Sequence, residues 1–207
     1  MPSRAAALLP FCLALFVCRA LTDAHARPID FTPIEVRTIE DGIPAVRTAF
    51  RDGTKKIFFR AAKGWRMAGG GTELKIYPKD RLDGYIRLAN SPIERPLEFA
   101  GEGLAAYRAS ARSALPKAAT HIEVLAEKTD AYPLDDWKSF EMHFAYEVNG
   151  VENRCWVLFI TMTPERRIWY VADARKADFD AVYAAARSML GSWFDPPPGW
   201  PPAPPSR

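Results

Sequence analysis

The sequence is poor in the side chains on which most catalytic and metal sites depend. Its 207 residues contain three histidines and three cysteines. Nucleophilic catalysis needs a histidine beside a serine or cysteine, with an acid that orients the ring, and a zinc site needs three or four ligands at short spacing. Neither pattern is present, and no G-x-S-x-G nucleophile motif occurs. We therefore expect a non-catalytic protein that carries no cofactor and no metal.

The sequence also lacks an excess of charge of one sign. It has 28 lysines and arginines against 25 aspartates and glutamates, a formal net charge of +3. Nucleic-acid-binding proteins concentrate positive charge on one surface, and this balance gives no basis for such a surface, so we expect no nucleic-acid partner. Beyond the N-terminus, no segment has the roughly 20 apolar residues that a membrane-spanning helix needs.

Residues 1–26 have the pattern of a secretory signal peptide. Arg4 precedes an apolar run of 14 residues, Ala5–Cys18, and Ala24-His25-Ala26 fits a small-residue cleavage site. The run is too short to span a bilayer. We expect cleavage after Ala26, or alternatively after Ala20, and export of the remaining chain to the periplasm or the medium. A lipoprotein attached through Cys18 is a further alternative, although bulky residues precede this cysteine.

Removal of this leader would leave Cys155 as the only cysteine. One thiol cannot form a disulfide within its own chain. Cys155 lies in the apolar run "RCWVLFITM", which is typical of a buried strand. We therefore expect a buried free thiol, and a disulfide between two chains is the alternative.

Residues 195–207, "DPPPGWPPAPPSR", form a proline-rich tail. Such a segment can neither continue a helix nor join a central strand, and it favours the extended polyproline II conformation. We exclude it from the predicted domain as a disordered tail. A second hypothesis makes the protein a scaffold that recruits a partner through this tail, with Trp200 as the anchor in an aromatic groove.

Three two-residue turn signals predict β-hairpins: Asp41-Gly42, Asp52-Gly53 and Asn149-Gly150. The first two predict a meander that begins in residues 27–54 and continues into "KKIFFRAA". Around the third, "SFEMHFAYEV" alternates apolar and polar residues, and two apolar segments, "CWVLFITM" and "RIWYVADA", follow. This pattern predicts a second meander of three strands.

Two helices are predicted. "EGLAAYRASARSAL" has an apolar stripe and ends at Pro116, and "DFDAVYAAARSMLGSWF" repeats apolar residues at helical spacing after Asp178, a possible N-cap. Strands, helix, strands and helix follow each other without βαβ alternation. We therefore expect a single α+β domain in which helices pack on an antiparallel sheet.

The glycine-rich stretch "GWRMAGGGTELKIYP", residues 64–78, resembles a phosphate-binding loop only at first sight. A P-loop has lysine and then serine or threonine directly after its second glycine, and here Gly70 and Gly71 occupy those places. The alternation in "TELKIYP" predicts a strand rather than the helix that would hold a phosphate. We expect a hairpin, with Trp65 anchored in the core.

This stretch, with its Gly64-Trp65 step, resembles the entrance of PsbP-like domains, and "ADF…L…W" (residues 177–193) is similar to their closing helix. The resemblance covers residues 55–194, and residues 27–54 would be an addition. It implies an α/β/α sandwich with a binding or accessory role toward a protein or small ligand, and it carries over no catalytic residue. The first functional hypothesis is therefore an exported, non-catalytic accessory or binding protein.

Four further residues are candidates for surface chemistry. His143 lies near Glu141 on the polar side of its predicted strand. A small secreted hydrolase using His143 and a nearby carboxylate is the alternative function, and a local salt bridge is the structural interpretation. Arg166 and Arg167 lie near a predicted hairpin tip. They could bind an anion or an acidic group of a partner, or simply belong to a solvated turn.

Overall fold

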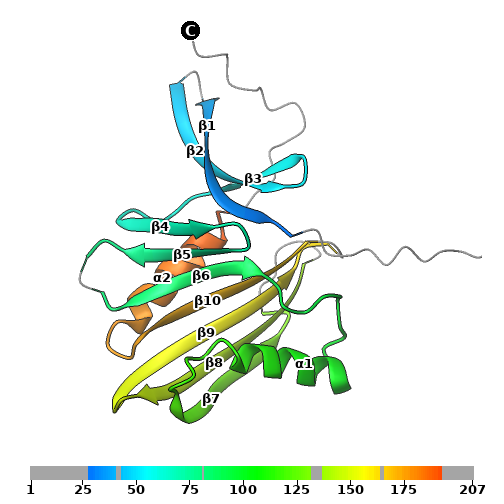
Figure 1. Cartoon of the computed structure of the whole chain (residues 1–207), viewed down its shortest axis with the longest axis vertical. Helices are drawn as coiled ribbons and strands as arrows, with labels where there is room; N and C mark the ends of the chain where they lie inside the picture. The colour runs from blue at the N-terminus through cyan, green and yellow to red at the C-terminus, as the bar shows by residue number, and fades with distance from the viewer. Residues whose placement is uncertain (1–27, 41–42, 81, 132–136, 164–165, 193–207) are drawn as a thin grey trace, which may run out of the picture.

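The computed structural model describes residues 28–40, 43–80, 82–131, 137–163 and 166–192 (Figure 1). The predicted signal peptide and proline-rich tail lie outside the described residues. Most of the described chain forms strands. Two short helices lie on opposite sides of the larger sheet.

The larger sheet has seven strands, and every neighbouring pair is antiparallel. From one edge to the other the order is β4 (Trp65–Gly70), β5 (Glu73–Pro78), β6 (Gly84–Asn90), β10 (Arg167–Arg175), β9 (Val151–Thr161), β8 (Lys138–Val148) and β7 (Thr120–Thr129). The predicted second meander is confirmed as β8, β9 and β10. The glycine-rich stretch is confirmed as the β4–β5 hairpin, in which Trp65 is partly buried and Gly71 has a φ of +67°.

The two helices cover different parts of the two sheet faces, which confirms the predicted α+β fold with helices packed on an antiparallel sheet. Helix α2 (Phe179–Leu190) packs on one face against β10, β6 and β9, and its Val182 and Ala186 belong to an apolar core that also includes side chains of β5. Helix α1 (Gly101–Arg112) packs on the other face against β8 and β9, through Tyr107 and Ala111. Helix α2 ends earlier than the sequence pattern predicts, with Gly191 as its C-cap.

A second, three-stranded sheet is formed by β1 (Asp30–Glu40), β2 (Ile43–Asp52) and β3 (Lys55–Phe59), as the first two turn signals predict. Phe31, Phe50 and Phe59 are buried in the same apolar core as α2. Asn90 of β6 also accepts a hydrogen bond from the backbone N–H of Ile29 at 2.8 Å and donates one to its carbonyl at 2.9 Å. These contacts attach the small sheet to the β4–β6 side of the larger one (Figure 1).

Cys155 is a free, buried cysteine in β9, as predicted. Within the described part of the chain, neither helix has the length and apolar character needed to cross a membrane.

Candidate functional site

The face of the larger sheet that carries α1 is only half covered by that helix. Helix α1 lies in front of β7, β8 and β9, while neither of the two described helices lies in front of the same face of β4, β5 and β6 (Figure 1). We call the surface on these three strands and the adjoining part of β10 the open sheet face. Its side chains are Arg66, Glu73, Lys75, Tyr77, Tyr85, Arg87, Trp169 and Asp173.

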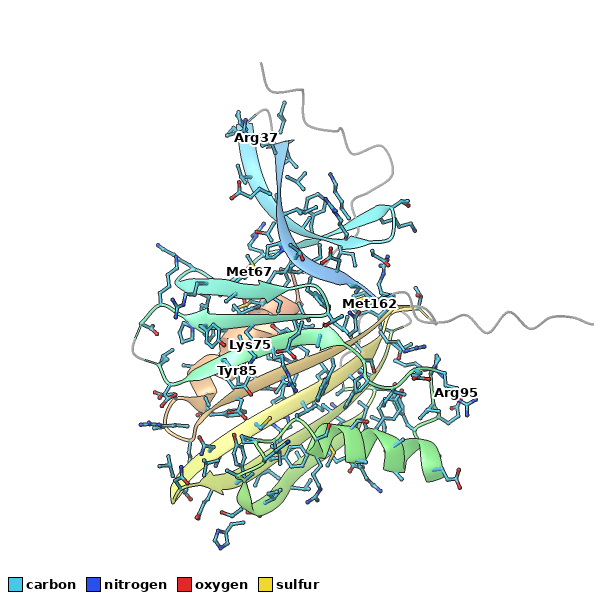
Figure 2. All side chains as sticks on the ribbon, in the orientation of Figure 1. Arg37, Met67, Lys75, Tyr85, Arg95 and Met162 are labelled. Atoms are coloured by element: carbon cyan, nitrogen blue, oxygen red, sulfur yellow. The ribbon has the colours of Figure 1, made fainter. Side chains whose placement is uncertain are left out.

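Strand alternation explains the composition of the open sheet face. Successive side chains of a strand point to opposite sides of the sheet. In "ELKIYP", Leu74 and Ile76 are fully buried in the core on the α2 side of the sheet, which places Lys75 and Tyr77 on the open sheet face. Figure 2 labels Lys75 and Tyr85 on the neighbouring strands β5 and β6.

Cations lie over all three aromatic rings of the open sheet face. The guanidinium carbon of Arg66 is 5.8 Å from the ring centroid of Tyr77, and the Nζ of Lys75 is 5.8 Å from that of Tyr85. The guanidinium carbon of Arg87 is 4.2 Å from the ring centroid of Trp169. Each such contact contributes about 0.5–1 kcal/mol at an exposed position, which favours the observed orientation of each ring.

Several buried donors beneath this surface have no hydrogen-bond acceptor. Among the residues that the structure describes, the Nε and Nη2 of Arg87 and the Nε1 of Trp169 make no hydrogen bond. The nearest ionic contact of Arg87 is from Nη1 to the carboxylate of Glu73, at 3.8 Å. A buried donor without a partner costs about 1–3 kcal/mol, so this part of the sheet is not optimised for stability alone.

A cavity of about 370 Å³ opens at one end of the open sheet face. Its walls include Arg66, Tyr77 and Tyr85 from three successive strands, with Asp173 of β10 beside Tyr85. Asp173 is only 7% exposed, so it forms the inner end of the cavity. At the outer end, the Nε of Arg175 and the Oδ2 of Asp83 form an exposed ion pair at 2.6 Å.

The electrostatics of the cavity are dominated by the buried Asp173. Burial raises the pKa of Asp173 to about 6, although hydrogen bonds from Tyr146 and Cys155 and the charge of Arg87 act in the opposite direction. The Tyr146 hydroxyl donates to the Oδ2 of Asp173 at 2.6 Å. Burial, and then the charge of Asp173, raise the pKa values of Tyr85, Tyr146 and Cys155. These three groups are therefore neutral hydrogen-bond donors at physiological pH.

The predicted pair His143 and Glu141 lies on the opposite face of the sheet, toward α2. The His143 Nε2 is 3.7 Å from Glu141 Oε1, and the Trp156 Nε1 donates to Glu141 Oε2 at 3.0 Å. The His143 ring packs against Tyr183 of α2, with centroids 5.5 Å apart. Burial acts to raise the pKa of Glu141, but the hydrogen bonds from His143 and Trp156 outweigh it, so the pKa lies below its usual value.

These contacts favour the structural interpretation of His143 and Glu141, a local salt bridge. The free thiol of Cys155 belongs to the core on the α1 side, away from this pair. Neither of the two cavities that we describe, the one at Asp173 and a second between residues 60–63 and the end of α2, is lined by His143 or Glu141.

The two candidate arginines make contacts within the protein. Arg166 donates to the carboxylate of Asp52 in β2, and so joins the β9–β10 hairpin to the small sheet. Arg167 is 4% exposed rather than in a solvated turn, and it donates to the backbone carbonyl of Glu94. Trp200 lies outside the described residues.

Metal binding has no obvious location in the described part of the chain, where no group of three or more His, Cys, Asp or Glu side chains could hold an ion. The side chains of the open sheet face were not identified from the sequence. Two signals could have indicated them: the polar and aromatic alternate positions of "ELKIYP" and "GYIRLAN", and Asp173 within the otherwise apolar "IWYVADA".

The structure is similar to several solved structures at low sequence identity. A cyanobacterial PsbP from Synechocystis matches at 13% identity with a TM-score of 0.46, over 68% of this chain and 86% of that chain. The Ran-binding protein Mog1p of Saccharomyces cerevisiae matches at 12% identity with a TM-score of 0.47, over 79% and 95%. LpqN of Mycobacterium tuberculosis, a protein involved in cell envelope biogenesis, matches at 14% identity with a TM-score of 0.46, over 82% and 92%.

No protein-family profile matches this sequence, and no curated protein matches it. These similarities concern the fold alone. One of the similar structures is a PsbP, which belongs to the family whose domains this sequence resembles.

Proposed function

We propose that this protein is an exported, non-catalytic binding protein that recognises its partner through the open sheet face. The observation that carries the proposal is the composition of this face, on which the rings of Tyr77 and Tyr85, and the partly buried ring of Trp169, lie together with arginine and lysine side chains. Neither described helix lies in front of β4, β5 and β6. Export rests on the signal-peptide pattern of residues 1–26.

An uncovered face of an antiparallel sheet normally carries small polar and charged residues that water solvates. Tyrosine, tryptophan and arginine are instead enriched among the residues that contribute most to protein interfaces. The rings of tyrosine and tryptophan bury a large area and lose little conformational freedom. Here a cation already lies over each tyrosine ring and favours its observed orientation. A partner would therefore meet a surface that needs little reorganisation, which favours binding.

Site-specific photo-crosslinking in the native host tests this proposal. A benzophenone amino acid replaces Tyr77 on the open sheet face, or Lys128 on β7 at the far edge of the sheet as the matched control. We expect one discrete adduct from position 77 and none from position 128. Equal labelling from both positions, or no adduct at position 77, would contradict the proposal.

A charge reversal gives a second measurement on the same adduct. Lys75→Glu places a negative charge at the centre of the face, and Lys138→Glu makes the same change on β8. Because the change removes the cation that lies over the Tyr85 ring and alters the charge that a partner meets, we expect Lys75→Glu to change the adduct yield by about tenfold or more. Lys138→Glu should leave it unchanged.

A further inference from the structure

The cavity at the end of the open sheet face contains a buried carboxylate that forms no ion pair. Of the described acidic side chains, Asp173 alone is buried. Its hydrogen bonds come from Tyr146 and Cys155, which are both neutral. A buried charge is stable only when it is paired or neutralised, and no side chain among the described residues forms a salt bridge with Asp173.

The walls beside Asp173 are suited to a positive charge. Tyr77 and Tyr85 line the cavity with ring centroids 6.4 Å apart, and the face of a tyrosine ring attracts a cation. The same attraction places Arg66 and Lys75 over these two rings. A volume of about 370 Å³ is near the lower end of known ligand sites, so it fits a side chain or a small molecule.

The other charges that face the cavity do not reverse this preference. Arg175 is already paired with Asp83 at 2.6 Å, and both are more than half exposed. Arg66 is exposed and lies over Tyr77. Arg87 is largely buried and its charge lowers the pKa of Asp173, but it is not among the residues that line the cavity, and it lies over Trp169. Exposed charges are screened by water and salt, whereas a buried carboxylate is screened much less.

We propose that this cavity binds a single guanidinium or ammonium group, with Asp173 as its counter-ion and the rings of Tyr77 and Tyr85 as its walls. The group can come from an arginine or lysine side chain of a partner protein or from a free small amine. This inference rests on the proposed function, because it assigns a ligand chemistry to the open sheet face.

The test is an NMR titration of the full chain at pH 7.5 with N-acetyl-L-arginine amide. The neutral isostere N-acetyl-L-citrulline amide is the matched control ligand. We expect saturable shifts of the amide signals of Asp173 and Tyr85 with the arginine probe, and binding about tenfold weaker or less with the citrulline probe. Equal binding of both probes would overturn the proposal, and so would the absence of saturable shifts with either.

Two variants assign the effect to the buried carboxylate. Asp173→Asn keeps the side-chain size and removes the charge, and we expect it to weaken arginine binding by about tenfold or more. Asp83→Asn changes an exposed acid at the outer end and should change binding by less than about threefold. Full binding by Asp173→Asn would overturn the assignment. A spectrum of each free variant verifies its fold, and Tyr77→Leu, which removes one ring, should also weaken binding.

A second ligand distinguishes the two sources of the cation. If n-propylguanidine binds as tightly as N-acetyl-L-arginine amide, the charged group alone is sufficient and a free amine fits the site. If the arginine derivative binds about tenfold more tightly, contacts to the peptide groups contribute and a partner's side chain is the source. The crosslinking result is independent: an adduct at position 77 without probe binding would refute only the cation site.

Discussion

Replacing Asp173 with asparagine should stabilise the folded protein at neutral pH, although it removes a group that we assign to binding. Burial raises the pKa of Asp173 from 3.8 to about 6 in the folded protein, despite the hydrogen bonds from Tyr146 and Cys155. One pKa unit corresponds to about 1.4 kcal/mol, so the ionised carboxylate lowers the free energy of unfolding by about 3 kcal/mol. Asparagine is neutral and nearly the same size, and it can still accept the hydrogen bond of Tyr146.

The pH dependence follows from the direction of this shift. The folded state holds the proton of Asp173 more tightly than the unfolded chain does, because its pKa is higher in the folded state. The stabilisation that this bound proton gives to the folded state is therefore complete below the unfolded pKa, near pH 4. It is lost as the pH rises through about 6. Asp173→Asn has no such titration. Its free energy of unfolding should exceed that of the parent protein by about 3 kcal/mol at pH 7.5, and by less than about 1 kcal/mol at pH 4.

Urea unfolding at a series of pH values between 4 and 7.5 measures this difference. Other carboxylates also titrate in this range, but their contributions cancel when the variant is compared with the parent at each pH. Asp83→Asn, at an exposed position of the same cavity, should differ from the parent by less than about 0.5 kcal/mol throughout. If the difference for Asp173→Asn stays constant with pH, the carboxylate is not held in the unfavourable environment that the structure indicates, and the reasoning is refuted.

Three further predictions concern other parts of the chain. Phe50→Ala should lower the free energy of unfolding by about 3–5 kcal/mol, because its buried ring joins the small sheet to the main core, while Ile43→Ala at an exposed position should change it by less than about 0.5 kcal/mol in the same urea assay. Glu141→Gln should destabilise the fold at pH 7 but not below the unfolded pKa of the carboxyl group. The pKa of Glu141 is lowered in the folded state, so its stabilisation is lost as the pH falls, and thermal unfolding at pH 3 and pH 7 checks this. N-terminal sequencing of the protein from its native host should begin at Arg27 or Leu21, and an intact Met1 would contradict the predicted cleavage.

The local pattern of the sequence predicted most of the strands and both helices. The turn pairs Asp52-Gly53 and Asn149-Gly150 lie at hairpins of the small and large sheets, and the β4–β5 hairpin replaces the apparent phosphate loop. These features depend on residues close together in the chain. Turn geometry and period-two alternation determine them without reference to the rest of the fold.

The candidate site was not predicted, because it depends on pairings between distant segments. Tyr85 and Asp173 become neighbours only when β6 pairs with β10, and Cys155 joins them when β9 pairs with β10. Asp173 within the otherwise apolar "IWYVADA" indicates a buried acid, but the residues near it in the sequence do not show which strands lie beside it. The sequence did place His143 near Glu141, since both lie on one strand, but the hydrogen bond from Trp156 to Glu141 again requires the partner strand.

The half-covered sheet connects the stability of this protein with its proposed binding. Under α1 this face of the sheet is an apolar core that contains Phe140 and Phe159, whereas β4, β5 and β6 have neither described helix in front of them. Instead, these strands carry rings beneath cations, donors without acceptors and a carboxylate whose ionisation opposes folding. Each of these features lowers the free energy of unfolding or adds little to it, and all of them lie on one surface. A cation bound beside Asp173 would favour the ionised form of its carboxyl group. Ligand binding would therefore raise the free energy of unfolding and offset part of the decrease that the unpaired carboxylate causes. N-acetyl-L-arginine amide should therefore raise the unfolding midpoint of the parent protein at pH 7.5, and at the same concentration it should raise that of Asp173→Asn much less.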